Sequence, residues 1–451
     1  MKFTVLYILL VLFLGTSCSG FLDLKPEQKM AVPKTLEHCE LLLNDYSAMN
    51  TGYPTLGEIA ADDYYLNTSD WKSLSNFDEQ QTYNWSLEFM TLNTHWQNPY
   101  KTVYLSNQIL SILAQLDQNY DKVKYGKILG AAHFFRAFAF HQAASVFTMP
   151  YQAETAETEM GIPLRLKPEL DYKSTRSSLA ETYTQIVSDY KQAIRYLPEV
   201  ETLKGRPGKA AAYAGLARVY LDMQAYDKAY ANADSCLRLR PELLNYKDLK
   251  ASASLPITKF NVEVIFPATS IFSSPLGQSF ARIDPDLFKS YGEHDYRKGV
   301  YFKPNTSEAG TYAYKGSYDN STTTPFIGLT TSEVYLIRAE AAVRTNKIGQ
   351  ALGDLNILLK NRINPTFFTE IAETDPNELL RIVLQERRKE LVFRGRRWSD
   401  LRRLNLDDRF KKTLKRSIDG QNYTLEPNSL KYAHLIPDLV ISESGIIQNK
   451  R

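Results

Sequence analysis

Cysteine is scarce in this chain of 451 residues, which contains only three. One of them, Cys18, follows the apolar start of the chain, and removing it leaves Cys39 and Cys236. Two residues so far apart in the sequence provide neither a disulfide framework nor the close spacing of a zinc site. We expect both to be buried free thiols, with one disulfide between them as the alternative.

Sequence motifs of common enzymes are also missing. The chain has no His-Glu-x-x-His, no Gly-x-Ser-x-Gly and no phosphate-binding loop. Its histidines are scattered, and Asp62 and Asp63 are adjacent rather than placed across a cleft as a glycosidase requires. The sequence therefore predicts a protein that is not an enzyme and has neither cofactor nor metal. A hydrolase whose carboxylates come from distant positions is the alternative.

Excess charge and long apolar runs are lacking too. The formal net charge is +3, whereas nucleic-acid binders have a strongly basic surface, so no nucleic-acid partner is expected. The one long apolar run, Phe3–Leu14, is too short to span a bilayer and follows Lys2 as in a signal peptide.

The residues after this run indicate a membrane anchor. Gly15-Thr16-Ser17-Cys18 resembles a bacterial lipobox, with Gly15 where leucine is usual. Cleavage before Cys18 would leave a thiol for lipid attachment, and more than one acyl chain gives durable anchoring. We predict a signal peptide over residues 1–17 and a soluble body, residues 18–451, held to the membrane by its lipid alone. An ordinary secretory signal is the alternative.

Aromatic residues are abundant, and they gather in two stretches with many turns. The chain has 29 Tyr, and the stretches 53–96 and 255–330 mix aromatic side chains with Gly, Pro, Ser, Thr and Asn. Such rings either cover the edge of the core or offer flat faces for stacking. The predicted ligand-binding residues are Tyr65, Trp71, Tyr301, Tyr312 and Tyr314.

A helical repeat is present between these stretches. The tetratricopeptide pattern, about 34 residues long, places large, small and aromatic residues at fixed offsets. It is matched by Tyr213, Leu216, Ala217, Tyr220, Ala229 and Pro241. A second copy starts near Ser332 and is matched by Tyr335, Ala339, Ala342 and Ala351. Because about three units are needed for stability, we expect degenerate units in the helix-periodic segments 99–118, 127–147 and 179–197.

The fold predicted from these observations is mainly α. It is a tetratricopeptide-like stack of helix pairs with a loop-rich, aromatic-rich insertion and a few short strands, one of them over Val262–Phe266. Ser178 and Glu181 have the spacing of a capping box at the start of the third segment. The expected parts are a loop-rich N-terminal part (19–98), helices (99–254), an aromatic insertion (255–330) and a second helix pair with the C-terminal region (331–451).

One charged stretch near the C-terminus stands out. Arg387 and Glu390 lie on the same apolar helix face as Leu380 and Leu384. A charge on a face that packs into the core is costly unless it is paired. We expect a structural ion network around Trp398, with Gly395 breaking the helix between its two halves. Its predicted members are Arg387, Glu390, Arg397 and Asp400.

This stretch also resembles the C-terminal signature of the SusD/RagB family of outer-membrane nutrient-binding lipoproteins from Bacteroidetes. The matching residues are Glu386, Arg387, Glu390, Leu391, Gly395, Arg397, Trp398, Asp400 and Leu401, with Arg394 where many members have Glu. Further segments resemble the family, and they are 21–26, 161–164, 333–341, 435–438 and 446–449.

The resemblance implies a function in nutrient uptake. Family members bind an oligomeric nutrient, by default a glycan, at the cell surface and deliver it to a SusC-like TonB-dependent transporter. It implies an outer-membrane, lipid-anchored and cell-surface location for this chain. An oligopeptide-binding member of the same family and a tetratricopeptide scaffold for a partner protein are the alternatives.

Overall fold

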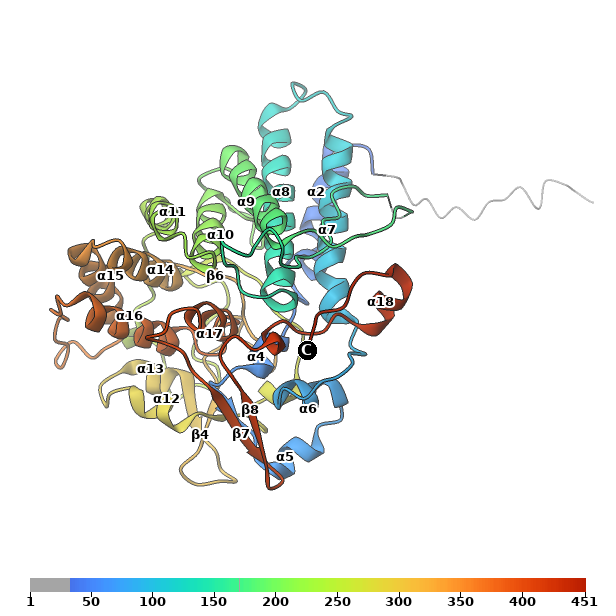
Figure 1. Cartoon of the computed structure of the whole chain (residues 1–451). Coiled ribbons are helices and arrows are strands. Elements are labelled where there is room, and N and C mark those ends of the chain that lie inside the picture. Colours follow the sequence, from blue (N-terminus) through green and yellow to red (C-terminus); the bar gives the residue numbers. More distant parts are fainter. Residues whose placement is uncertain (1–32, 170) are drawn as a thin grey trace, which may run out of the picture.

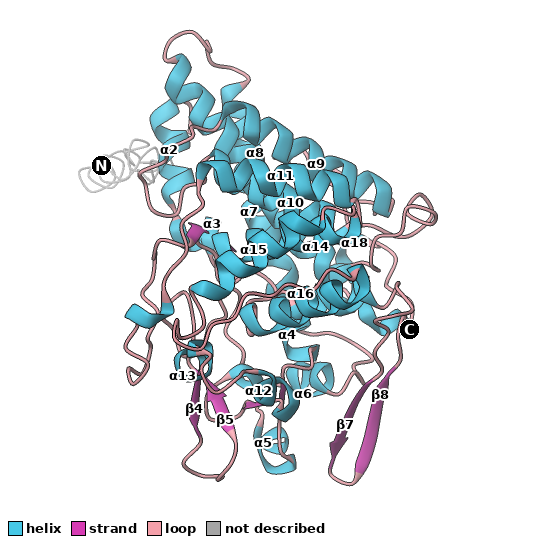
Figure 2. Ribbon diagram, turned by 90° about the vertical axis from the view of Figure 1, so that its left-hand side faces the viewer, coloured by secondary structure: helices cyan, strands magenta, loops and turns pink. Residues whose placement is uncertain are grey.

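The computed structural model describes residues 33–169 and 171–451, and most of its regular structure is helical. Figure 1 shows a layer of long helices that curves over a half built from short helices, loops and hairpins. Figure 2 shows the β4–β5 and β7–β8 hairpins at the end of the molecule away from the long helices. The mainly α fold predicted from the sequence is confirmed.

The curved layer consists of helices that pack in chain order. Helix α8 lies between α7 and α9, and α10 joins α9 to α11. Helix α14 then packs against α11, α15 and α16. The bounds are α7 Thr94–Leu113, α8 Lys122–Phe147, α9 Leu179–Tyr196, α10 Lys209–Asp222, α11 Tyr226–Leu239, α14 Thr331–Arg344, α15 Ile348–Lys360 and α16 Pro376–Glu390.

Both tetratricopeptide-like units form the helix pairs expected from the sequence. Helices α10 and α11 make the first pair, and α14 and α15 make the second. Small residues permit the close packing: a Cβ atom at Gly215 of α10 would lie 2.5 Å from the ring of Tyr190 on α9. Ala217 and Ala229 are completely buried between the helices.

The start predicted for α9 is correct, whereas α7 begins five residues before the start predicted for it. Ser178 caps α9, and the capping box with Glu181 is formed in both directions. Helix α7 begins at Thr94, ahead of the expected start at Pro99. Pro99 therefore removes one backbone hydrogen bond inside the helix instead of occupying its first turn.

The other half of the molecule contains short elements. Its helices are α2 Leu36–Asn44, α3 Tyr46–Asn50, α4 Leu56–Ala60, α5 Thr68–Ser73, α6 Phe77–Tyr83, α12 Pro285–Ser290, α13 Tyr296–Tyr301, α17 Arg397–Leu404 and α18 Asp438–Ser444. Single turns of 3-10 helix occur at Tyr246–Asp248, Ser274–Leu276 and Leu430–Tyr432. Helix α2 packs back on α7 and α8, α3 packs on α7, and α18 lies beside the lower end of α7, whereas α13 packs against β4.

The described strands form four two-stranded antiparallel sheets. Two sheets join distant segments: β1 Tyr64–Tyr65 pairs with β3 Arg282–Ile283, and β2 Val264–Phe266 pairs with β6 Leu329–Thr330. Two are hairpins, formed by β4 Phe302–Pro304 with β5 Tyr312–Tyr314 and by β7 Leu414–Ile418 with β8 Gln421–Leu425. The predicted strand over Val262–Phe266 thus corresponds to β2.

Aromatic packing holds the insertion against the helices. The ring of Phe266 on β2 lies 4.6 Å from Phe134 and 5.2 Å from Phe138, both on α8. All three rings are completely buried. Because each such ring removes a large apolar area from water, this contact fixes the start of the insertion on the helical layer. The part boundaries at residues 98, 254 and 330 stay predictions.

Gly395 ends the α16 region as the sequence predicts. Its φ of +67° is in the left-handed region, and the chain resumes as α17 at Arg397. A Cβ atom at this position would lie 2.6 Å from the Ile327 side chain. Cys39 and Cys236 are both buried and free, so the disulfide alternative is wrong.

Candidate functional site

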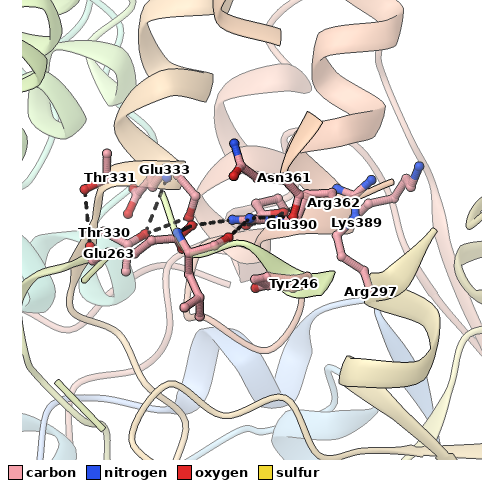
Figure 3. A network of polar contacts seen from close by, with 12 residues as sticks. Tyr246, Glu263, Arg297, Thr330, Thr331, Glu333, Asn361, Arg362, Lys389 and Glu390 are labelled. Carbon is pink, nitrogen blue, oxygen red and sulfur yellow. Dashed lines mark hydrogen bonds and ion pairs between the residues drawn. The ribbon is translucent and has the colours of Figure 1, made fainter. Parts of the chain in front are cut away.

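A buried network of charges joins the helical layer to the insertion (Figure 3). Arg362, just after α15, lies between Glu263 at 2.6 Å and Glu390 at 2.8 Å. Arg297 of α13 reaches Glu390 at 3.3 Å and Glu386 at 2.6 Å. Segments from the helices and from the insertion therefore meet through side chains that are removed from water.

The network is balanced electrostatically. Burial opposes the charge on Glu390, but Arg362 and Arg297 outweigh this effect and hold the pKa of the Glu390 carboxyl below its ordinary value. The Arg362 guanidinium also lies 3.9 Å from the centre of the Tyr246 ring, over its face. Because its members are almost fully buried and paired with one another, this network connects the segments structurally and offers little surface to a ligand.

The four charged residues expected around Trp398 do not form one network. Arg387 contacts Asp400 directly at 2.8 Å. Glu390 belongs to the network of Figure 3, and Arg397 instead binds Asp62 at 2.6 Å. The turn at Gly395 directs the start of α17 toward the N-terminal segment, which explains why Arg397 finds a partner that is distant in sequence.

Trp398 itself packs in an aromatic group. Its ring centre lies 4.7 Å from that of Tyr432 and 5.2 Å from that of His434. Arg394, which replaces the usual family Glu, is buried with its guanidinium 4.1 Å from the centre of the Tyr318 ring. The positive charge of Arg394 thus contacts an aromatic face.

The loop-rich half carries an open hollow of about 410 Å³ on its surface. We call it the aromatic hollow; it is lined by Phe272, Ser274, Gly277, Gln278, Ser279, Phe280, Lys303, Thr322 and Thr323. Phe272 is 53% exposed, so one of its ring faces is open to solvent. The side-chain nitrogen of Gln278 is buried without a hydrogen-bond partner among the described residues. An exposed ring in a hollow lined by amide and hydroxyl side chains can stack on a ligand and hydrogen-bond to it.

Trp71 and Tyr65 lie half-buried near this face, on α5 and β1. The Trp71 indole donates a 3.0 Å hydrogen bond to the Gln80 carbonyl, and the Gln80 amide donates back to the Trp71 carbonyl at 3.0 Å. These bonds fix the orientation of the Trp71 ring. Tyr65 pairs in register with Arg282, which binds Asp70 and Glu308.

Tyr312 and Tyr314 already have one ring face covered. Tyr312 stacks on Phe288 with ring centres 3.6 Å apart, and Tyr314 stacks on Phe393 at 4.9 Å. The Tyr314 hydroxyl donates to the Gly316 carbonyl at 2.7 Å. Both residues are half-buried, so each can offer only part of its surface to a ligand.

Tyr301 does not belong in the predicted ligand-binding set. Its side chain is completely buried, and its hydroxyl lies 2.8 Å from the Tyr246 hydroxyl. The last turn of α13 directs the ring into the core, toward the network of Figure 3. A ring enclosed on all sides cannot stack on a ligand, and this correction leaves Tyr65, Trp71, Tyr312 and Tyr314 as predictions.

Sequence reasoning missed Phe272, Phe280, Gln278 and Lys303 of the aromatic hollow. One signal was available, because Phe272 precedes Ser273 and Ser274, and a ring with polar neighbours is more often exposed.

Comparison with known proteins identifies the family. The family described as "starch-binding associating with outer membrane" matches residues 20–221. The SusD family matches residues 278–437. The chain belongs to the SusD/RagB family.

Individual relatives within the SusD/RagB family are distant in sequence but similar in length and fold. The SusD-like protein P2 of Formosa agariphila is 26% identical over 70% of this chain and 72% of its own length. A SusD superfamily structure from Bacteroides thetaiotaomicron has a TM-score of 0.74 at 24% identity and covers 92% of this chain and 100% of its own. A Bacteroides vulgatus structure named a SusD-like carbohydrate binding protein has a TM-score of 0.65 at 19% identity, covering 91% and 97%.

The adjacent carboxylates of this SusD/RagB chain are held by arginines. Asp62 binds Arg397 at 2.6 Å and Lys412 at 2.6 Å, and Asp63 binds Arg388 at 2.9 Å. In residues 33–169 and 171–451, no group of three or more His, Cys, Asp or Glu side chains is arranged to hold a metal ion.

The predicted membrane attachment involves Cys18, near the start of the chain. Across the part of the chain that the structure describes, no helix is both long enough and apolar enough to cross a bilayer. Cys18, the predicted site of lipidation, lies outside the described residues.

Proposed function

We propose that this protein is a cell-surface lipoprotein that binds an oligosaccharide at the aromatic hollow and delivers it to a SusC-like TonB-dependent transporter. The observation that carries the proposal is the exposed ring of Phe272 in an open hollow that is also lined by amide and hydroxyl side chains. Membership of the SusD/RagB family supports both the ligand class and the association with the outer membrane.

The dimensions and lining of the hollow suit a saccharide. Its volume of about 410 Å³ lies within the usual range for small-molecule sites, roughly 300–1,000 Å³. A sugar ring has an apolar face that can stack on Phe272 and hydroxyl groups that can bond to Gln278 and Thr322. Because the hollow is open, a long chain can pass through it with its ends in solvent.

The remaining parts of the proposal follow from the family and the N-terminal sequence. A lipid on Cys18 would hold the protein at the outer membrane. The rigid frame of helix pairs would present the aromatic loops without changing shape. The protein would bind its ligand without turning it over, and the transporter would carry the ligand inward.

Calorimetry against a panel of neutral oligosaccharides and oligopeptides tests the proposal. We expect one class of oligosaccharide to bind. Because Phe272→Ala removes an aromatic contact to the ligand, it should weaken this binding about tenfold, or about 1.4 kcal/mol. Phe367→Ala is the matched control, because Phe367 is 54% exposed but lies outside the aromatic hollow. Binding of peptides alone, or equal affinity in the Phe272 variant, would contradict the proposal.

A further inference from the structure

A second open hollow, of about 350 Å³, lies between α7, the loop residues Pro163, Arg165, Lys167 and Ser174, and α18. We call it the α7–α18 hollow. It shares no lining residue with the aromatic hollow. Figure 1 places α18 beside the lower end of α7, whereas β4, which carries Lys303, is at the other edge of the loop-rich half.

Aromatic rings from successive turns of α7 form one wall of this hollow. Trp96 and Tyr100 stack with ring centres 4.9 Å apart, and Tyr104 follows one turn later. The Tyr100 hydroxyl donates to the Pro163 carbonyl at 2.8 Å, and the Tyr104 hydroxyl accepts from Gln108 at 2.6 Å. Half-buried Tyr104 therefore has a fixed ring and can contribute to an apolar surface for a ligand.

The rim formed by Arg165 and Lys167 carries positive charge that has no carboxylate partner in the part of the chain that the structure describes. Arg165 uses its terminal nitrogens on the Tyr172 and Glu169 carbonyls and on the Ser174 hydroxyl, all neutral acceptors. Lys167 is exposed. In the described residues neither side chain has an acidic group within ion-pair distance, in contrast to most buried arginines near the C-terminus.

A third cation lies close by. Arg176 donates to the carbonyls of Gly161, Met160 and Ile447 and to the Asn449 side chain, again neutral acceptors. Burial lowers the pKa of the Arg176 guanidinium to about 10, and within residues 33–169 and 171–451 no carboxylate opposes this effect. The α7–α18 hollow is therefore lined by two positive charges, Arg165 and Lys167, that have no carboxylate partner among the described residues, and Arg176 lies behind its Tyr100 wall.

The charged rim is held in position from below. Asn107 of α7 is buried and donates to the Arg165 carbonyl at 2.8 Å. The side-chain oxygen of Asn107 accepts a hydrogen bond from Arg136 at 2.8 Å, and Arg136 forms an ion pair with Asp189 at 2.6 Å. This chain of bonds ties the loop to α7, α8 and α9, so the rim is preorganised for a ligand.

We propose that the α7–α18 hollow is a second binding site and that its ligand is an anionic sugar residue carrying a carboxylate or sulfate. The flat face of the sugar lies on the wall formed by Tyr104 and the stacked Trp96–Tyr100 pair. Its anionic group lies at Lys167 and Arg165, where charge-assisted bonds are about twice as strong as neutral ones. The proposal rests on the proposed saccharide-binding function, since it assigns a further unit of the same ligand class to a different face.

The test measures binding of two anionic probes against uncharged counterparts by calorimetry. The probes are trigalacturonate and neocarrabiose sulfate, and the counterparts are fully methyl-esterified trigalacturonate and unsulfated neocarrabiose. We expect at least one anionic probe to bind about tenfold or more tightly than its counterpart, with affinity falling as salt is raised. If neither anionic probe binds more tightly than its counterpart, the inference is overturned.

Variants locate the binding. Lys167→Gln and Tyr104→Ala should each weaken the anionic probe about five- to tenfold. The controls Lys191→Gln and Tyr120→Ala, exposed residues outside both hollows, should leave it unchanged. Thermal unfolding of each variant verifies that it is folded. Equal affinity in the wild type and both test variants overturns the inference.

The two proposals fail in different ways. Phe272→Ala should leave the binding of the anionic probe unchanged while it weakens the neutral oligosaccharide. Binding that depends on Phe272 but not on Lys167 would overturn only the second site. Anionic binding that depends on Lys167, without any ligand sensitive to Phe272, would overturn only the proposed role of the aromatic hollow.

Discussion

Arg362 and Glu390 contact each other at 2.8 Å, and neither side chain has any exposed surface. Arg362 lies just after α15, and Glu390 is the last residue of α16. Through Glu263 and Arg297 the same pair reaches the insertion, so one buried charge pair connects the repeat to the loops that carry the aromatic hollow.

Removing the charge of Glu390 should destabilise the protein strongly. Glu390→Gln leaves Arg362 and Arg297 buried with less compensating charge, and we expect a loss of about 3–5 kcal/mol in the free energy of unfolding. Glu370→Gln is the control, because Glu370 pairs with Lys360 at 2.7 Å on the surface and should cost at most about 1 kcal/mol. Denaturant unfolding measures both. Equal losses would show that the buried network does not contribute as described.

The stability contributed by Glu58 should decrease as pH rises. Burial, with a contribution from Asp63, raises the pKa of the Glu58 carboxyl from 4.5 to about 8. The folded protein therefore keeps a proton that the unfolded chain releases. The contribution to the free energy of unfolding is full below about pH 4.5, falls as the pH rises toward about 8 and then levels off.

A neutral variant isolates this effect. Glu58→Gln keeps an acceptor for the 2.8 Å hydrogen bond from the Gly395 amide but does not titrate. Relative to the wild type, its free energy of unfolding should rise between pH 5 and pH 8 by on the order of 3 kcal/mol. Denaturant unfolding of both proteins across this pH range measures the difference. A constant difference between Glu58→Gln and the wild type would contradict the assignment.

Gly395 should tolerate no side chain. Gly395→Ala places a Cβ atom 2.6 Å from the Ile327 side chain at a φ of +67°, and we expect a loss of roughly 2–4 kcal/mol from strain and overpacking together. Gly445 has almost the same φ, +68°, with no atom near its added Cβ. Gly445→Ala should therefore lose only the conformational part, about 1 kcal/mol. Thermal unfolding that ranks the two variants in the reverse order would refute this explanation.

Substitution of Tyr301 should lower stability and leave oligosaccharide affinity unchanged, whereas substitution of Trp71 should lower the affinity. Tyr301→Phe removes a buried hydroxyl that contacts Tyr246, so stability should fall by about 1–2 kcal/mol without any change in oligosaccharide affinity. Trp71→Ala, at the surface of the loop-rich half, should weaken binding. Calorimetry and denaturant unfolding on the same samples separate the effects. Weaker binding by a fully folded Tyr301→Phe protein would restore Tyr301 to the ligand-binding set.

Features that depend on local sequence could be predicted correctly. The spacing of small and aromatic residues in Tyr213–Pro241 predicted the α10–α11 pair, because helix packing repeats with the period of the helix itself. Ser178 and Gly395 likewise act on their own neighbouring backbone, as a cap and as a left-handed turn. The sequence could also show that Glu390 needs a buried partner, but not which residue that partner is.

Tertiary structure alone decided which side chains meet and which rings remain exposed. Tyr301 and Phe272 both stand in aromatic loops, yet the first is completely buried and the second is 53% exposed. The α7–α18 hollow combines residues from three segments that are far apart in the chain. Local sequence determined the helix pairs and their ends because hydrogen bonding and periodicity act over a few residues. Partners and surfaces depended on the fold because they arise only when distant segments pack together.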